Sequence, residues 1–264
     1  MCYAWPKPPN DGDERMKYLA PLALAGLMAA TPAVADLTDM NDAERDAFRA
    51  EVRAYLLDNP EVLMEAIGVL EQRQAAAEAE RDEMGVAANN DALFNSAFDW
   101  VGGNPEGDVV LVEFIDYRCS FCRRAHPEVA DLVELDGNIR RIVKEFPILG
   151  EQSVLASQFA IATRIVNGDD AYAEMNDALM TMRGDVTEAS LAATANELGL
   201  DPGPILDAMG DPLVSQTISY NRELAQRLQI SGTPTFVFGD QLVRGYVPLD
   251  AMLEIVDTVR SDMN

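Results

Sequence analysis

Two cysteines that lie three residues apart, Cys119 and Cys122, are the side chains of this sequence best placed to carry out chemistry. They follow an almost wholly apolar run at residues 109–115, which predicts a buried strand, and they open a segment that predicts a helix. A C-x-x-C pair at such a junction is typical of thiol–disulfide exchange. Because Cys2 lies in a segment that we expect the mature protein to lack, we predict one redox-active dithiol and no structural disulfide.

The two thiols are expected to play different parts. Cys119 should lie at a helix N-terminus, where unpaired backbone amides and the helix dipole favour a thiolate. We therefore predict that Cys119 is the nucleophile that forms a mixed disulfide with a client. Cys122, one turn further along, is predicted to be more buried and to act as the resolving thiol.

Two other uses of the pair are a structural bridge and half of a zinc site. A bridge across so short a loop would add little stability. Zinc needs four protein ligands, or three with water, and the single histidine, His126, leaves a Cys122/His126 site incomplete. We therefore expect redox catalysis without a metal or a cofactor.

Glu113 is the one charged residue inside the apolar run. Burial would raise its pKa and make it a proton acceptor for Cys122, whereas a strand-end carboxylate that reaches solvent is the alternative. Asp116 is expected to be an exposed turn residue, and His126 a packed structural residue. Arg123 and Arg124 either support the thiolate or form a solvated helix face.

The elements around this pair follow from hydrophobic spacing. Residues 41–84 predict helix with a break at Asn59-Pro60, and the first part carries an apolar stripe of Phe48, Val52, Tyr55 and Leu56. The second part becomes rich in alanine and glutamate, which favours either a helical linker or an oligomer stalk. A strand at 109–115, a helix from Cys119 and a strand at 139–146 form a β-α-β unit. Mostly helical residues 152–228, a hairpin at 235–245 and a helix at 249–260 complete the chain.

This order of elements resembles the thioredoxin fold, and the helical insertion at about 152–228 is similar to that of the DsbA family of periplasmic disulfide oxidoreductases. The resemblance covers roughly residues 91–264 and rests on the C-x-x-C, Glu113 six residues before it, Pro127 five residues after it, and Thr233-Pro234-Thr235 before the hairpin. The expected fold class is α/β, a thioredoxin-like fold with a helical insertion, preceded by an N-terminal helical extension at 36–90.

The resemblance implies roles for two further residues. Pro234 is expected to be a cis-proline in a loop that faces the C-x-x-C and pairs with an extended client peptide. Thr233 would bind the same client and tune the sulfurs through its hydroxyl. The alternative for Pro234 is a trans-proline that opens a strand.

Ser120 and Phe121, between the cysteines, are expected to tune the redox equilibrium. C-x-x-C proteins span roughly −270 to −120 mV, about 7 kcal/mol for a two-electron couple. Strongly oxidising DsbA proteins carry a histidine where this chain has Phe121. Since phenylalanine cannot stabilise a thiolate by charge, we predict a less extreme oxidant.

Composition and the N-terminal segment indicate the compartment. The chain has 264 residues, 45 acidic and 20 basic, and its formal charge of −25 argues against a nucleic-acid partner. From Met16, a short basic region, an apolar stretch at 19–30 and an A-x-A site ending at Ala35 predict a cleaved signal peptide. Met16 is expected to be the true start and the mature protein to be periplasmic, where disulfides persist; an uncleaved membrane anchor is the alternative.

The predicted function is a periplasmic thiol–disulfide oxidoreductase that forms or rearranges disulfides in exported proteins. Its partners would be cysteine-containing exported proteins and a membrane or periplasmic redox partner. The extension at 41–84 and Thr233 favour a relative of the oligomeric suppressor-of-copper-sensitivity-type isomerases, which implies a homo-oligomer through residues 41–84. A non-catalytic copper(I)-handling or chaperone-like protein on the same fold is the alternative, because two thiols suit a soft metal.

Overall fold

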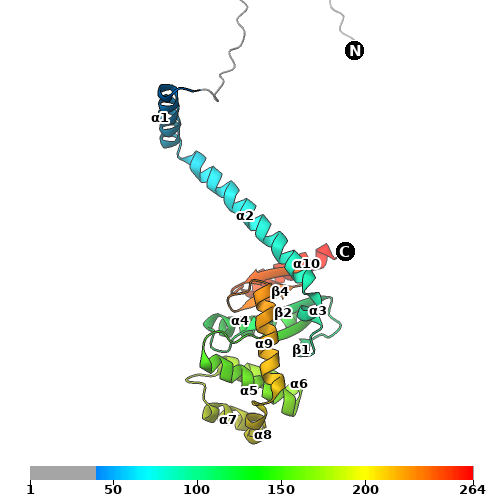
Figure 1. Cartoon of the computed structure of the whole chain (residues 1–264). Helices are drawn as coiled ribbons and strands as arrows, with labels where there is room; N and C mark the ends of the chain where they lie inside the picture. The colour runs from blue at the N-terminus through cyan, green and yellow to red at the C-terminus, as the bar shows by residue number, and fades with distance from the viewer. Residues whose placement is uncertain (1–39, 264) are drawn as a thin grey trace, which may run out of the picture. The chain divides into compact units, whose positions relative to one another are not determined.

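The computed structural model describes residues 40–263, which form two compact units that divide after Leu63 (Figure 1). The over-extended start and the signal peptide predicted for residues 1–35 lie outside the described residues, and the predicted domain boundaries stay predictions. The helices are α1 (Asp42–Asp58), α2 (Glu61–Ala88), α3 (Asn90–Phe94), α4 (Ser120–Asp136), α5 (Glu151–Asn167), α6 (Asp169–Thr181), α7 (Glu188–Glu197), α8 (Pro202–Ala208), α9 (Pro212–Arg227) and α10 (Leu249–Asp262). The strands are β1 (Trp100–Gly103), β2 (Val109–Ile115), β3 (Ile139–Glu145), β4 (Thr235–Phe238) and β5 (Gln241–Arg244).

The first unit holds α1 and the beginning of α2. Asn41 caps α1 through a capping box with Glu44, which satisfies two backbone N–H groups that the first turn leaves unpaired. The helix ends before Asn59-Pro60, as expected, because a proline disfavours a helical conformation in the residue before it. No residue of α1 is buried, so its apolar side chains face outward.

In the second unit, the latter half of α2 packs on the domain that carries the sheet. Val86 is buried in the core, and Asp82 accepts two hydrogen bonds from the guanidinium of Arg244 at the end of β5, one of them 2.8 Å long. This contact joins α2 to the strand that pairs with β4.

The sheet has the order β1-β3-β2-β4-β5. β2 and β3 are parallel, connected through α4, and every other pair is antiparallel. Gly137, with φ 70°, ends α4 in the left-handed conformation, which lets the chain turn directly into β3. The β-α-β unit predicted from hydrophobic spacing is present at the expected residues.

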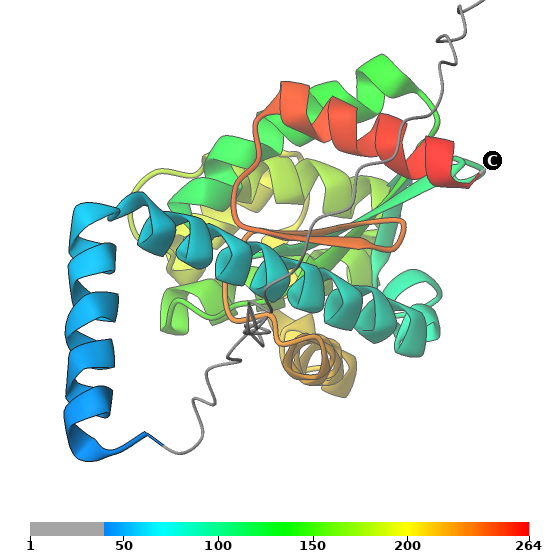
Figure 2. The ribbon, with the colours of Figure 1, turned by 90° about the horizontal axis from the view of Figure 1, so that it is seen from above.

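Helices cover both faces of the sheet (Figure 2). α4 and α10 bury one face against Leu111, Ile139 and Phe236, while α9, α3 and the end of α2 bury the other face against Val112 and Phe114. α5 to α9 form the expected helical insertion between β3 and β4.

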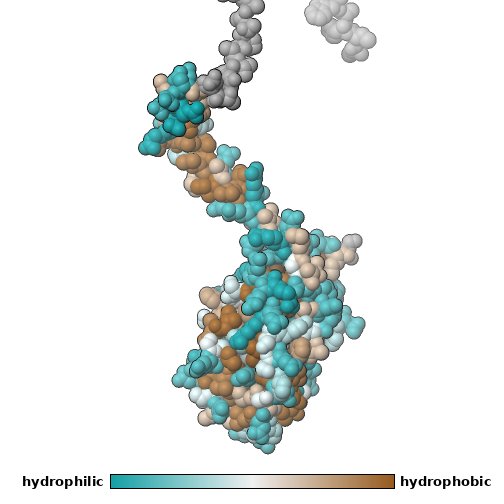
Figure 3. Space-filling model, viewed as in Figure 1, coloured by the Kyte–Doolittle hydropathy of each residue, from teal (hydrophilic) through white to brown (hydrophobic). Residues whose placement is uncertain are grey.

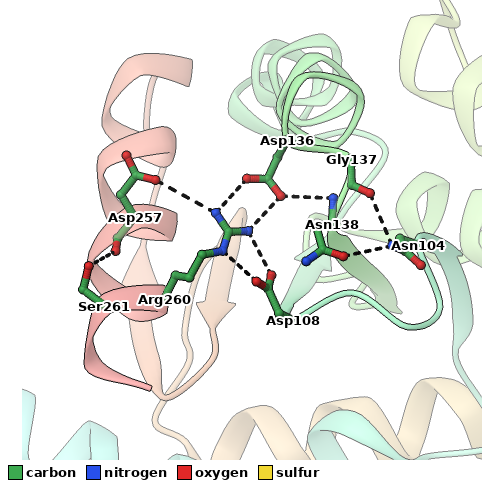
Figure 4. A network of polar contacts seen from close by, with 8 residues as sticks. All are labelled: Asn104, Asp108, Asp136, Gly137, Asn138, Asp257, Arg260 and Ser261. Atoms are coloured by element: carbon green, nitrogen blue, oxygen red, sulfur yellow. Dashed lines mark hydrogen bonds and ion pairs between the residues drawn. The ribbon is translucent and has the colours of Figure 1, made fainter. Parts of the chain in front are cut away.

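A polar network holds α10 at the end of the sheet where the parallel strands begin (Figure 4). Arg260 of α10 donates to Asp108, which precedes β2, and to Asp136 at the end of α4, with distances of 2.8 to 3.1 Å. The cysteines follow β2 at the opposite end of the sheet, so this network supports the scaffold and leaves the C-x-x-C end open.

Two short elements differ from the sequence-based expectation. β1 and α3 lie between the predicted helix at 41–84 and the predicted strand at 109–115, where the sequence pattern predicted no element. β1 contains Gly102 and Gly103, which weaken strand propensity, and it is held at the sheet edge by pairing with β3. Within residues 40–263, no helix combines the length and the apolar character needed to cross a bilayer.

Candidate active site

Cys119 is the N-cap residue of α4 and has an extended backbone, φ −75° and ψ 118°. Its N–H donates to the carbonyl of Asp116 at 3.0 Å, and its own carbonyl accepts from Arg123 at 3.1 Å, as the first bond of the helix. Both cysteines are free thiols. Cys119 is 7% exposed and Cys122 2%, which confirms that the second thiol is the more buried.

The pKa values of the two thiols are shifted in opposite directions. The pKa of Cys119 is lowered from 9.0 to about 5, chiefly because the Cys122 thiol donates a hydrogen bond to its thiolate, with further help from Thr233 and from backbone N–H groups of the first turn. The pKa of Cys122 is raised, because its proton is held in that same hydrogen bond and because the group is buried. One thiolate beside one thiol is the arrangement that a nucleophile and a resolving cysteine require.

Thr233 and Pro234 lie against the cysteines, and the peptide bond between them is cis, as the sequence predicted. Cys119 Sγ is 3.1 Å from the carbonyl oxygen of Thr233, which accepts a hydrogen bond from the protonated thiol. Among the described residues, the buried Thr233 hydroxyl oxygen has no hydrogen-bond partner. It can therefore donate to the Cys119 thiolate, which lowers the pKa of Cys119. Pro234 accepts from the N–H of Gly245 at 2.9 Å, which fixes the loop at the end of β5.

Glu113 is buried in β2, as expected, but its carboxylate forms an ion pair with Arg141 of the neighbouring strand β3. Both residues lie on the sheet face that α4 covers. In the described part of the chain, the hydrogen bond of Glu113 therefore runs to Arg141, and a proton transfer from Cys122 to Glu113 stays a prediction.

Asp116 is fully buried, so the expectation of an exposed turn residue is wrong. One carboxylate oxygen accepts from the N–H of Arg118 at 2.7 Å. The other accepts from Ile148 at 2.8 Å and Leu149 at 3.0 Å. Asp116 thus ties the loop before Cys119 to the loop after β3.

Glu145, at the end of β3, is a buried acid that the sequence reasoning missed. Its carboxylate accepts hydrogen bonds from the hydroxyls of Tyr117 (2.6 Å), Tyr172 (2.7 Å) and Ser157 (2.7 Å). Burial raises its pKa from 4.5 to about 7, although the three hydroxyl donors oppose that rise. Tyr117 stands two residues before Cys119, so the network supports the segment that leads into the C-x-x-C. Because β3 also contains Arg140, Arg141 and Lys144, its sequence carried no signal that Glu145 is buried.

His126 packs one turn beyond Cys122, and its Nε2 lies 2.8 Å from Asp177 of α6. Its near-complete burial agrees with the expectation of a packed residue. Phe121 and Ser120 are exposed at the tip of α4. Among residues 40–263, no cluster of three or more histidine, cysteine or acidic side chains is arranged to hold a metal ion.

Comparison with known families gives two matches along the chain. Residues 110–257 match the model of the DSBA-like thioredoxin domain, which confirms the thioredoxin-like fold class with its helical insertion. Residues 44–77, covering most of α1 and part of α2, match the N-terminal domain of the copper resistance protein ScsC.

Solved structures agree with both matches. A thioredoxin-like oxidoreductase from Silicibacter pomeroyi DSS-3 is 43% identical, with a TM-score of 0.62 over 66% of this chain and 98% of that chain. Proteus mirabilis ScsC in a transitional conformation is 30% identical, with a TM-score of 0.62 over 84% and 98%. A periplasmic thioredoxin-like protein from Salmonella enterica serovar Typhimurium is 29% identical, with a TM-score of 0.59 over 64% and 94%.

Curated relatives are much longer proteins. The Na(+)/H(+) antiporter NhaA 1 of Salinispora arenicola is 29% identical over 154 residues, which make up 58% of this chain and 24% of that protein. The chain therefore spans about a quarter of the length of the curated relatives it matches.

Proposed function

We propose that this chain, which belongs to the family of DSBA-like thioredoxin domains, is a thiol–disulfide oxidoreductase that forms or rearranges disulfides in exported proteins. Cys119 is the nucleophile, Cys122 the resolving thiol, and the Thr233-Pro234 loop the surface along which the client lies. Ser120 and Phe121 tune the thiolate, and Glu113 serves as a proton acceptor behind Cys122.

The bonds and electrons of the exchange balance between the protein and its client, without a further reactant. In the reducing direction, the Cys119 thiolate attacks a client disulfide, a bond forms between Cys119 Sγ and one client sulfur, and the second client sulfur leaves as a thiolate. Cys122 then loses its proton and attacks Cys119 Sγ, which releases the first client sulfur and leaves a Cys119–Cys122 disulfide. The client has gained two electrons, and the reverse sequence oxidises a client dithiol.

The observation that carries the proposal is the position of Cys119 at the N-cap of α4, where its pKa is lowered to about 5. The carbonyl oxygen of Thr233 lies 3.1 Å from the sulfur of Cys119. A thiol with this pKa is ionised at neutral pH. It is therefore ready to attack, and it is a good leaving group when a client attacks the disulfide form.

Trapping the mixed disulfide tests the two assignments. In a Cys2→Ser background, Cys122→Ala should accumulate a covalent adduct with a disulfide-containing peptide, visible by mass spectrometry. Cys119→Ala should form no adduct and lose exchange activity. Exchange activity that survives Cys119→Ala would overturn the nucleophile assignment.

The direction of the reaction is decided by comparing two substrates. An isomerase, held reduced by its partner, should restore activity to a scrambled-disulfide protein, whereas an oxidase should act fastest on a fully reduced one. We propose the isomerase role, because residues 44–77 match the ScsC N-terminal domain and α1 has no buried residue. Faster oxidation of the reduced substrate with no rescue of the scrambled one would reverse this assignment.

A periplasmic location is supported by the predicted signal peptide and by the likeness to a periplasmic thioredoxin-like protein. The partners would be exported proteins that contain cysteines and a membrane or periplasmic protein that resets the dithiol. Osmotic-shock fractionation of cells that express the full chain, with detection of the processed N-terminus, tests the location.

A further inference from the structure

The segment around the cysteines has a charge opposite to that of the whole chain. Residues 117–127 contain Arg118, Arg123 and Arg124 and no acidic residue, in a chain with 45 acidic and 20 basic residues. The charge of Arg118, after burial, lowers the pKa of Arg123, which indicates that the two guanidinium groups lie close together. Arg222 of α9 contacts the same region, because it donates to the carbonyl of Pro147. The next two residues, Ile148 and Leu149, donate their N–H groups to Asp116.

These four arginines are held by neutral partners. Arg118 donates to the carbonyl of Gly184 at 2.7 Å and Arg123 to that of Tyr117 at 2.7 Å. Arg222 donates to the carbonyl of Pro147 at 2.9 Å, and Arg124 stacks over the ring of Tyr246, 4.2 Å from its centroid.

None of the four forms an ion pair with a carboxylate in the described part of the chain. Among the other described arginines, Arg141, Arg164 and Arg260 each pair with an acid, whereas Arg140 and Arg183 do not. The guanidinium groups near Cys119 are therefore positioned by neutral groups, and Asp116 is the acid whose charge acts on one of them, Arg123.

The contacts of these arginines reach two different parts of the structure next to the C-x-x-C segment. Tyr246, under Arg124, follows Gly245, whose N–H binds Pro234, so Arg124 is on the side of the cis-proline loop. Arg118 and Arg222 are on the side of the helical insertion, where they contact Gly184 and Pro147.

Exposed apolar side chains complete this surface. Phe121 is 55% exposed beside Cys122, and Ile148 and Leu149 are exposed in the loop that Asp116 holds. Ile148 also lines an apolar groove with Pro147, Val154 and Leu155, and Arg222 forms one edge of it.

We propose that Arg118, Arg123, Arg124 and Arg222 make this site selective for acidic client segments, in which aspartate or glutamate flanks an exchangeable cysteine with apolar residues nearby. The inference rests on the proposed function and names its substrate class. An extended segment along the Thr233-Pro234 loop would place its carboxylates next to Arg124 on one side of Cys119 and next to Arg118 or Arg222 on the other.

Acidic residues also lie near this surface, but most of them already have hydrogen-bond or ion-pair partners. Asp116 is buried, with its oxygens on three backbone N–H groups, and Glu128 is bound to Tyr246 and to the N–H of Leu249. Asp185 accepts from Gln152, and Asp177 is paired with His126. Glu151, which lines the groove, is the acid that a bound carboxylate would have to avoid.

The test uses three peptides of equal length with one cysteine linked by a disulfide to 2-mercaptoethanol, flanked by glutamate, glutamine or lysine. The second-order rate constant for attack by the reduced full chain is measured at low and high salt. The overall charge of −25 predicts that the lysine peptide reacts fastest. Our proposal predicts the opposite order, with the glutamate peptide fastest and the difference shrinking as salt rises.

Arginine variants locate the effect. Arg118→Gln, Arg124→Gln and Arg222→Gln should each lower the glutamate-to-lysine rate ratio by roughly two- to fivefold, the range of a partly exposed ion pair. Glu151→Gln should raise the ratio. Arg140→Gln, a matched loss of charge at the opposite end of β3, should leave it unchanged.

A small neutral disulfide, bis(2-hydroxyethyl) disulfide, distinguishes a failure of the charge selectivity from a failure of the proposed function. If the chain reduces it but treats the three peptides alike, or favours the lysine peptide, the charge selectivity is wrong while the proposed function stands. If the chain attacks neither this compound nor any peptide, the proposed function itself fails.

Discussion

At the scale of single residues, the reactivity of Cys119 depends on its neighbour. The proton on Cys122 is held between two sulfurs, and it stabilises the Cys119 thiolate more than Thr233 or the backbone does. Burial would by itself raise the pKa of Cys119, so its low pKa is a product of these contacts.

A thiolate titration checks this account. The ultraviolet absorbance of the Cys119 thiolate should titrate with a midpoint near 5 in the reduced protein. Cys122→Ala should raise that midpoint strongly, by more than Thr233→Val, because the Cys122 hydrogen bond is the largest cause. Thr258→Val, which removes a hydroxyl on α10, is the matched control and should have no effect. A midpoint that stays near 5 in Cys122→Ala would show that Thr233 and the backbone N–H groups of the first turn stabilise the thiolate without Cys122.

Glu145 makes the stability of the fold depend on pH. Its pKa is about 7 in the folded chain and 4.5 ordinarily, so between these values the folded state binds more protons than the unfolded state. The contribution of Glu145 is therefore fully present below pH 4.5 and is lost as pH rises through 7, a change of roughly 3 kcal/mol in the free energy of unfolding.

We expect Glu145→Gln to remove this dependence, because glutamine does not titrate. Measured by urea unfolding, the stability of Glu145→Gln relative to the parent should rise by roughly 3 kcal/mol between pH 4 and pH 8. Glu134→Gln, on the exposed surface of α4, serves as the control for loss of one charge. A difference between Glu145→Gln and the parent that does not vary with pH would contradict the raised pKa.

At the scale of elements, the hydrophobic patterns of the sequence predicted the strands and the helix around the C-x-x-C. The continuous apolar run of β2 and the helical spacing of α4 predicted these elements, and the C-x-x-C with Thr233-Pro234 indicated the order of the two halves. The charges at the end of β3 were not predictable in the same way. Lys144 and Glu145 resemble solvent-facing strand ends, and only contacts with Asp99, Tyr117 and Tyr172, 27 to 45 residues away, show why they are buried.

Lys144 and Asp99 join β3 to the segment before β1 through a buried ion pair. Burial lowers the pKa of Lys144 and raises that of Asp99, while each group's charge opposes the other's shift. Lys144 also donates to the carbonyl of Ala92 at 2.8 Å, at α3. The pair therefore fixes the segment between α3 and β1 against β3.

Breaking one half of this pair should cost far more than replacing both. Lys144→Met leaves Asp99 buried alone and should reduce the free energy of unfolding by roughly 3–5 kcal/mol in chemical denaturation. The double variant Lys144→Met/Asp99→Leu should recover much of that loss, since two apolar side chains then pack together. Arg49→Gln, which breaks an exposed pair with Asp46, should cost less than about 1 kcal/mol. A double variant no more stable than Lys144→Met would show that the ion pair itself stabilises the junction.

At the scale of the whole molecule, α1 and the first half of α2 each expose apolar side chains. Phe48, Val52 and Tyr55 of α1 are each 40 to 55% exposed, and Phe48 and Val52 line a hollow with Leu56 and Leu63. Figure 3 shows apolar side chains exposed along the first half of α2, where Met64, Ile67 and Leu70 lie. Exposed apolar side chains at helical spacing are typical of a surface that packs against another helix.

We infer that a second copy of this chain covers that surface, because residues 44–77 match the N-terminal domain of ScsC. In a symmetric homo-oligomer the same apolar helix face of each copy is buried, and an assembly of this kind would hold several Cys119 sites around one client. We propose that rearranging a client's disulfides gains more from several sites around one client than forming them does. The assembly state is thus linked to the direction of the chemistry.

Light scattering of the mature chain should therefore give a mass of more than one subunit. Val52→Asp places a charge in the apolar face of α1 and should shift the mass to a single subunit, because an unpaired carboxylate is costly to bury. Ala50→Asp adds the same charge on the opposite side of α1 and should leave the assembly intact. If Val52→Asp also lowers the refolding of a scrambled-disulfide substrate but leaves the attack on bis(2-hydroxyethyl) disulfide unchanged, assembly serves isomerisation rather than thiol chemistry. A parent chain with the mass of one subunit would remove the oligomer and, with it, the main support for the isomerase.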